Sequence, residues 1–258
     1  MAKGTSMSYR NALNQFLRYA ESAAPNLLRP ELEMGPAYVR ALEARGLKPA
    51  SVKSLLCGAR MLYRALRWTG ATTADPFVDT RAPRDTTAPW DKRQPYSEED
   101  VSALLEVAPL RDQVLILLCA HGGLRISEAL ALAWDDVEEG VVIVQRGKGG
   151  KRRRVDCSRR LSEALQRYRE VHPAATTNGL VVGGEYSTAC DRLAGLAQRA
   201  GVTYRAFHSF RHHAGTKLYR QTGRLEDAAR HLGHSTIETT RIYAKWADDT
   251  VKKAVQDW

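Results

Sequence analysis

The spacing of apolar and polar positions in the first 80 residues predicts helices. In residues 51–68, SVKSLLCGARMLYRALRW, apolar side chains recur every three or four residues, which places them on one helix face. These positions are Val52, Leu55, Leu56, Ala59, Leu62, Tyr63 and Leu66. The opposite face carries four basic residues and no acidic ones: Lys53, Arg60, Arg64 and Arg67. One face should pack, while the other is either an ordinary solvated surface or a surface for phosphates.

Residues 81–95 follow neither the helix nor the strand period and are rich in Pro, Thr and charge, which is typical of a linker. We therefore predict a helical N-terminal domain at residues 1–80 and a second domain at residues 96–258. Ser97 and Asp100 have the spacing of a capping box, so a helix should begin there. Both domains contain more Lys and Arg than Asp and Glu, so together they could enclose one polyanionic partner.

A different pattern appears in residues 141–157, VVIVQRGKGGKRRRVDC, where two short runs that include β-branched residues flank a glycine-rich turn. This pattern predicts a hairpin with Lys148 at or near its tip. Pro109 should start a buried helix in LRDQVLILLCA, and helical periodicity returns after Leu161. The expected fold is mainly α with a small β-sheet or hairpin, comprising an all-helical N-terminal domain and a mixed α/β C-terminal domain.

Composition favours a polyanionic partner, because 39 Lys and Arg residues against 29 Asp and Glu residues give a formal net charge of +10. No stretch approaches the roughly 20 apolar residues of a membrane span, and MAKGTSMSYR lacks the apolar core of a signal peptide. We therefore expect no membrane partner and a cytoplasmic protein. The four cysteines are widely separated, so free thiols are expected at Cys57, Cys119, Cys157 and Cys190.

Two pairs at helical spacing suggest anion chemistry. In HGGLRISEAL, Arg125 and Glu128 lie three residues apart, so the carboxylate can orient the guanidinium; a simple surface salt bridge is the alternative. In HSFRHHAG, His208 and Arg211 have the same spacing, and a guanidinium fork beside an imidazole suits a phosphate. A purely structural role is the alternative here as well.

The clustering of five of the seven histidines between residues 208 and 234 raises a metal site as a further alternative. No HExxH motif occurs, and the neighbouring residues are arginines rather than the acids of a two-metal nuclease. RGKGGK does not satisfy GxxxxGK[ST] either, which argues against a nucleotide-binding loop. We therefore expect no metal and no cofactor.

Taken in order, four segments between residues 122 and 243 resemble the catalytic domain of the tyrosine recombinase (phage integrase) family, with Xer-like members the most similar in organisation. The segments are GGLRISEAL, RGKGGKRRRV, HSFRHHAG and LGHSTIETTRIY. The resemblance extends, more weakly, to a helical core-binding domain before the linker. Phe210, Ala214 and Lys245 stand where the family often has Leu, Thr or Ser, and His, and none of the three changes removes a catalytic group.

This resemblance implies six catalytic positions: Arg125, Lys148, His208, Arg211, His234 and Tyr243. Tyr243 would be the nucleophile, because a phenol oxygen can both attack a phosphodiester and leave again. The two arginines would hold the nonbridging oxygens, and Lys148 would protonate the leaving 5′ oxygen. The resemblance also implies proton transfer at the tyrosine for His208, a phosphate hydrogen bond for His234 and a supporting role for Glu128.

The same resemblance implies double-stranded DNA with paired half-sites as the partner, with a dimer on one site, a tetramer in synapsis and a nucleoid-associated location. Residues expected to contact DNA are Lys53, Arg60, Arg64, Arg67, Lys151 and Arg152. The amphipathic tail after Tyr243 is expected to dock on an adjacent subunit or on its own domain. Tyr219, the nearest competing tyrosine, suits helix packing better.

The expected function is site-specific recombination through a 3′-phosphotyrosine intermediate, serving Xer-like dimer resolution or integration and excision of a mobile element. We expect no additional arm-site domain before the core-binding helices. Two other functions remain open at this point. A type IB topoisomerase would relax supercoils without paired sites, and a catalytically silent DNA-binding protein would never form a covalent adduct.

Overall fold

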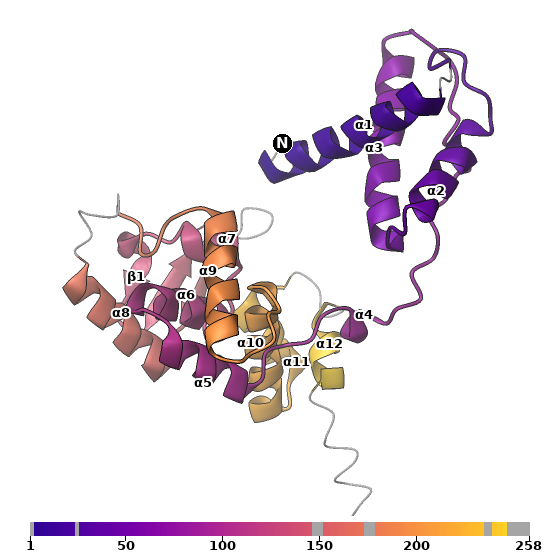
Figure 1. Cartoon of the computed structure of the whole chain (residues 1–258). Coiled ribbons are helices and arrows are strands. Elements are labelled where there is room, and N and C mark those ends of the chain that lie inside the picture. The colour runs from indigo at the N-terminus through magenta and orange to yellow at the C-terminus, as the bar shows by residue number, and fades with distance from the viewer. Residues whose placement is uncertain (1–2, 24–25, 146–151, 173–178, 235–238, 247–258) are drawn as a thin grey trace, which may run out of the picture. The chain divides into compact units, whose positions relative to one another are not determined.

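The computed structural model describes residues 3–23, 26–145, 152–172, 179–234 and 239–246 (Figure 1). The chain divides into two compact units, Met1–Thr87 and Ala88–Trp258, here called the N-terminal unit and the C-terminal unit. The linker predicted at residues 81–95 spans the boundary between them. Within that segment Pro89–Lys92 forms a one-turn helix, α4, which begins at a proline in the first turn and was not evident from periodicity.

The N-terminal unit is built from α1 (Lys3–Ala23), α2 (Met34–Ala44) and α3 (Pro49–Trp68). Its core is aromatic, since the rings of Phe16, Tyr38, Tyr63 and Phe77 contact one another with centroids 5.1 to 6.3 Å apart. The apolar face predicted for residues 51–68 is the face that α3 packs, and Tyr63 is fully buried there. The predicted helical character of this region is therefore confirmed.

The C-terminal unit continues with helices that surround one apolar core. Their bounds are α5 (Glu98–Val107), α6 (Leu110–Ala120), α7 (Ile126–Leu130), α8 (Arg159–Val171), α9 (Tyr186–Arg199), α10 (His208–Thr222), α11 (Leu225–Leu232) and α12 (Arg241–Trp246), with a 3-10 turn at Trp134–Asp136. The capping box at the start of α5 is present, because Ser97 Oγ accepts from the Asp100 N–H at 3.0 Å while the Asp100 carboxylate accepts from the Ser97 N–H. This helix start was correctly predicted.

A small antiparallel sheet lies beside these helices, in the order β1 (Val137–Glu138), β2 (Val141–Val144) and β3 (Arg153–Asp156). In the β2–β3 hairpin Val144 pairs with Arg153 and Val142 pairs with Val155. The hairpin predicted from the sequence is confirmed, with β1 as an additional strand. Lys148 and Lys151 belong to the residues between β2 and β3 that lie outside the described chain.

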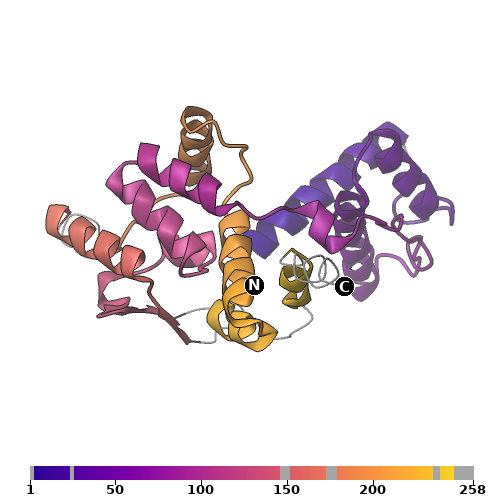
Figure 2. The ribbon, with the colours of Figure 1, turned by 90° about the horizontal axis from the view of Figure 1, so that it is seen from below.

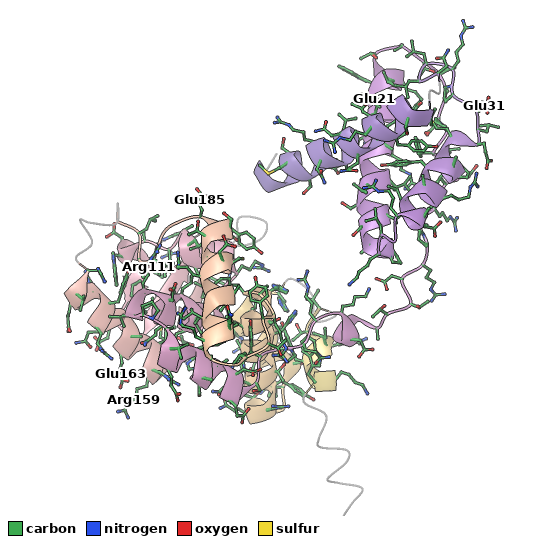
Figure 3. The ribbon with its side chains drawn as sticks, in the orientation of Figure 1. Glu21, Glu31, Arg111, Arg159, Glu163 and Glu185 are labelled. Carbon is green, nitrogen blue, oxygen red and sulfur yellow. The ribbon has the colours of Figure 1, made fainter. Side chains whose placement is uncertain are left out.

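Helix α6 is buried along almost its whole length and packs against both α8 and α10. Helices α10, α11 and α12 form a group at one end of the unit, as both ribbon views show (Figures 1 and 2). Arg111 at the start of α6 donates to the carbonyls of Val182 and Gly183, each at 3.2 Å, and so ties α6 to the segment before α9 (Figure 3). Helices that are far apart in the sequence therefore pack together through their contacts with α6 and α10.

Candidate active site

The turn between α6 and α7 presents Arg125 to the site. Gly123 has a φ of 62°, a backbone conformation that glycine adopts most easily, and the chain then enters α7 with Arg125 as the N-cap residue. Glu128 accepts from the Arg125 backbone N–H at 2.9 Å and from its Nη1 at 2.8 Å. The pair predicted at i and i+3 is present, and the carboxylate orients both the helix start and the guanidinium.

Glu128 has a second partner that the sequence reasoning missed. Arg153, on β3, donates from Nη1 and Nη2 to the two oxygens of Glu128 at 3.0 and 2.7 Å. Burial alone would raise the pKa of Glu128, but hydrogen bonds from Arg153 and Arg125 outweigh it and lower the pKa to about 2. Strand alternation could have revealed Arg153, because it lies on the same face of β3 as the buried Val155.

Arg211 is the most deeply buried cation of the site, with only 1% of its surface exposed. From α10 it donates to the carbonyl of Gly123 and, at 2.6 Å, to the carbonyl of Leu232. Burial lowers the pKa of Arg211 to about 10, so the guanidinium remains protonated at neutral pH. The two backbone carbonyls fix the plane of the Arg211 guanidinium. Its remaining N–H groups therefore point in a fixed direction, from which they can donate to an anion.

A pocket of about 380 Å³ brings three of the predicted catalytic residues together. Arg125, His208 and Arg211 line it, along with Arg93, a residue of the predicted linker. Burial, followed by the charges of Arg93 and Arg211, lowers the pKa of His208 to about 4, so its imidazole is neutral at pH 7. His208 also contacts the ring of His212 edge-on, with the ring centroids 4.4 Å apart. The pocket is therefore a concave, cationic site suited to a phosphate.

Arg93 is the second residue that sequence reasoning missed. It follows α4 in an extended conformation and is exposed, yet it lines the same pocket as Arg125 and Arg211. Helix α4, which precedes it, packs against α12. The basic pair Lys92 and Arg93 in the linker was the available signal, but periodicity does not show which basic residues of a linker reach a site.

Tyr243 has 1% of its surface exposed and, like His234, is not among the residues that line this pocket, although it is close enough for the charges of Arg211 and Arg125 to act on it. Its ring is nearly parallel to that of His234, with centroids 6.0 Å apart and an interplanar angle of 19°. The His234 ring is held in turn by a 3.0 Å hydrogen bond between its Nδ1 and Thr240 Oγ1. Burial raises the pKa of Tyr243 to about 12, although the charges of Arg211 and Arg125 act in the opposite direction. The phenol is therefore protonated at neutral pH.

The residues expected to contact DNA differ in their surroundings. Lys53 and Arg64 are exposed on α3. Arg60 donates to the carbonyl of Thr80, and Arg67 forms a 2.7 Å ion pair with Asp75, so both arginines hold the segment that follows α3. Arg152, next to β3, is exposed. The predicted basic face therefore contains two side chains that also stabilise their own unit.

The described part of the chain contains neither a metal-binding cluster nor a membrane-spanning helix. Within it, no three His, Cys, Asp or Glu side chains are grouped closely enough to hold a metal ion. None of the helices in these same ranges has the length and apolar character needed to cross a membrane. Tyr219, the competing tyrosine, packs partly buried in the small cluster formed by Ala214, Ala228, Leu232 and Tyr243.

Comparison with known families gives two matches. Residues 96–249 match the model of the phage integrase family, and residues 1–70 match that of the phage integrase N-terminal SAM-like domain. Among curated proteins, the tyrosine recombinase XerC of Xanthomonas campestris pv. campestris (strain B100) is 34% identical over 219 residues, which cover 80% of this chain and 67% of that protein. The tyrosine recombinase XerD of Rhizobium meliloti (strain 1021) is 28% identical, with coverage of 99% and 89%.

Solved structures show that the fold is shared. A lambda integrase(75-356) dimer bound to a COC′ core site superposes with a TM-score of 0.76 at 17% identity and covers 97% of this chain and 90% of that one. The XerH site-specific recombinase bound to a palindromic difH substrate, in a post-cleavage complex, gives 0.74 at 20% identity, with coverage of 97% and 79%. On the strength of the sequence matches, the chain belongs to the phage integrase family and is a Xer-like tyrosine recombinase.

Proposed function

We propose that this protein is a site-specific DNA recombinase that cuts and rejoins DNA through a 3′-phosphotyrosine intermediate. The observation that carries the proposal is that the buried Tyr243 lies close enough to Arg211 and Arg125, two arginines of the pocket, for their charges to act on its phenol. The proposed phosphate-binding groups come from the N-cap of α7 and from α10, and the proposed nucleophile comes from α12, so the site forms only in the folded unit. Relatives named as tyrosine recombinases support this chemistry.

In the proposed reaction, Tyr243 Oη attacks the scissile phosphorus while the bond from phosphorus to the 5′ oxygen breaks. The tyrosine proton passes to His208, which is neutral at pH 7 and can accept it. Lys148 gives a proton to the departing 5′ oxygen, and its position is outside the described residues. The bond energy is kept in the phosphotyrosine ester, so rejoining needs no ATP, and the guanidinium groups take the electrostatic role that a metal has in other enzymes.

Arg125 and Arg211 are proposed to hold the nonbridging oxygens, which gain negative charge in the transition state. Their orientation is set before DNA binds, by Glu128 for Arg125 and by two backbone carbonyls for Arg211. His234 is proposed to hydrogen-bond the same phosphate through Nε2, because Thr240 holds Nδ1. We assign Arg93 to the same phosphate or to its neighbour in the strand.

We also propose a division of labour between residues 1–80, which bind DNA, and residues 96–258, which carry out catalysis. The partner is double-stranded DNA with paired half-sites, with a dimer on each site and a tetramer in synapsis. Related structures include a lambda integrase dimer on a core site and a lambda integrase tetramer bound to a Holliday junction. We further propose Xer-like dimer resolution, or integration and excision of a mobile element, as the biological role, and a cytoplasmic, nucleoid-associated location; similarity to proteins named as Xer tyrosine recombinases supports this part of the proposal.

The decisive experiment uses nicked suicide DNA substrates in EDTA, in which cleavage traps the covalent complex. We expect the parent protein to form an adduct that maps to Tyr243, and the Tyr243→Phe variant to form none, because the ring then lacks its attacking oxygen. Tyr219→Phe is the matched control, since this tyrosine packs in the same cluster. An adduct in Tyr243→Phe would contradict the proposal, and relaxation of plasmids without paired sites would favour a topoisomerase.

A further inference from the structure

A glycine of α10 lies directly beneath the ring of Tyr243. A Cβ atom built on Gly215 would lie 2.5 Å from Cζ, 2.6 Å from Cε2 and 2.8 Å from Cε1 of Tyr243. Carbon atoms in contact are normally about 3.5 to 4.0 Å apart. The tyrosine ring therefore occupies the volume that any other side chain at position 215 would need.

The backbone of Gly215 does not require glycine. The residue lies inside α10, and it is absent from the described glycines with positive φ. Glycine is one of the poorest residues for a helix interior, because it has the most conformational freedom to lose. What glycine supplies at this position is space, and Tyr243 fills that space.

The other sides of the Tyr243 ring are also bounded. The rings of His234, His212 and Trp246 each have centroids 6.0 Å from that of Tyr243. The atom that would clash first with a new Cβ is Cζ, which carries the nucleophilic oxygen. A side chain at position 215 would therefore push the reactive end of the ring away from α10, the helix that also carries Arg211.

We propose that Gly215 is a positioning residue for the nucleophile, because its missing side chain sets the depth at which Tyr243 lies against α10. This inference rests on the proposed function. A displacement of about 1 Å from reactive geometry is enough to slow an enzymatic step on the order of 10²-fold. The three atoms nearest to a Cβ at position 215 all belong to Tyr243, so the effect of a substitution should fall on cleavage rather than on DNA binding.

The experiment compares Gly215→Ala with Gly195→Ala in single-turnover cleavage at saturating suicide DNA. Gly195 is a matched control, because it also lies inside a helix, α9, and a Cβ there meets only Arg199 Nη1, at 3.7 Å. We expect Gly215→Ala to cleave about 10- to 100-fold more slowly with its DNA Kd within about twofold of the parent. Gly195→Ala should match the parent in both measurements.

A substrate with a bridging 5′ phosphorothiolate separates nucleophile placement from protonation of the leaving group. A thiolate leaves without needing a proton, so the Gly215→Ala defect should persist on this substrate. The inference is overturned if Gly215→Ala cleaves at the parent rate, if its loss is explained by a weaker Kd, or if the phosphorothiolate restores the rate. Tyr243→Phe tests the proposed function separately, since an inactive Tyr243→Phe beside a fully active Gly215→Ala would reject only the role of Gly215.

A second measurement, of thermal unfolding midpoints, tests the inference even if Gly215→Ala folds poorly. In the Tyr243→Ala background the ring is gone, so an added Cβ has room and alanine improves the helix. We expect Gly215→Ala to raise the thermal midpoint in that background and to raise it less, or lower it, when Tyr243 is present. Equal shifts in the two backgrounds would show that residue 215 and the tyrosine ring are not coupled.

Discussion

Basic residues in the two units have different environments, although both units are rich in them. On α3 of the N-terminal unit, Lys53 and Arg64 are exposed to solvent. In the C-terminal unit, Arg211 is 1% exposed and the Arg153 side chain 12% exposed, and backbone carbonyls or Glu128 fix both. An exposed cation is screened and mobile, so it adds salt-dependent affinity. A buried, oriented cation can stabilise a transition state because it does not reorganise during the reaction.

Histidines separate the two units even more clearly, since all seven lie in the C-terminal unit. Burial lowers the pKa of six of them: His121, His208, His212, His213, His231 and His234. A site that packs imidazoles and guanidinium groups together keeps the imidazoles neutral, since burial and neighbouring positive charge both oppose protonation. This arrangement keeps the imidazoles unprotonated at neutral pH and makes the folded unit less stable in acid.

The largest expected effect is therefore selective acid unfolding of the C-terminal unit. Histidine pKa values of about 4 or 3 in the folded state, against 6.5 in the unfolded chain, mean that the unfolded chain binds protons first as the pH falls. Stability should decline from about pH 6.5 to pH 4. Each tenfold difference in proton affinity corresponds to about 1.4 kcal/mol, so several kcal/mol should be lost.

Hydrogen exchange of the whole chain at pH 7 and pH 5, corrected for the intrinsic effect of pH on exchange, measures this difference. Protection in α10 should fall by far more than protection in α3, which belongs to the unit without histidine. Equal losses of hydrogen-exchange protection in α10 and α3 would contradict the prediction that acid destabilises the C-terminal unit selectively.

The next effect concerns the buried guanidinium of the site. Arg211→Lys keeps the charge but cannot reproduce two carbonyl hydrogen bonds together with a phosphate fork. We expect cleavage at saturating DNA to fall on the order of 10²- to 10³-fold. Arg111→Lys is the structural control, because Arg111 also bonds two carbonyls but lies outside the pocket. Similar losses in both variants would indicate damage to the fold rather than to the phosphate site.

The smallest effect compares two exposed arginines, Arg93 beside the site and Arg64 on α3. Arg64→Ala and Arg93→Ala remove the same charge, so each should weaken DNA binding modestly and lower the salt slope by about one. Only Arg93→Ala should also slow the cleavage step, by about tenfold, because only Arg93 lines the pocket. The measurements are DNA Kd against salt and single-turnover rates. If Arg64→Ala slowed cleavage equally, the distinction between the two cationic surfaces would fail.

Many elements of this fold could be predicted because they depend on neighbours in sequence. The apolar face of residues 51–68, the capping box of Ser97 and Asp100, and the β2–β3 hairpin all follow from spacing within a few residues. The pairing of Arg125 with Glu128 follows from the i to i+3 geometry of a helix start. Helix α4 was missed, since one turn is too short to show a period.

Contacts between distant segments were beyond such reasoning. Strand alternation places Arg153 on the buried face of β3, but it does not indicate that its partner is Glu128, 25 positions earlier. Nothing local to Gly215 indicates that a ring from position 243 fills the space beside it. Arg93 gave only the general signal of a basic linker, and its position at the pocket depends on how the segment after α4 runs past α10.

By itself, the sequence determined the identity and order of the chemical groups, the helices that carry them and the excess of positive charge, because periodicity, capping and composition act locally. Tertiary structure alone decided which cations are buried, which imidazoles lose their affinity for protons and how deeply Tyr243 lies against α10. These properties depend on desolvation and close packing between elements that the chain separates. Reactivity at this site is therefore a property of the packed unit, although each reactive group can be read from its motif.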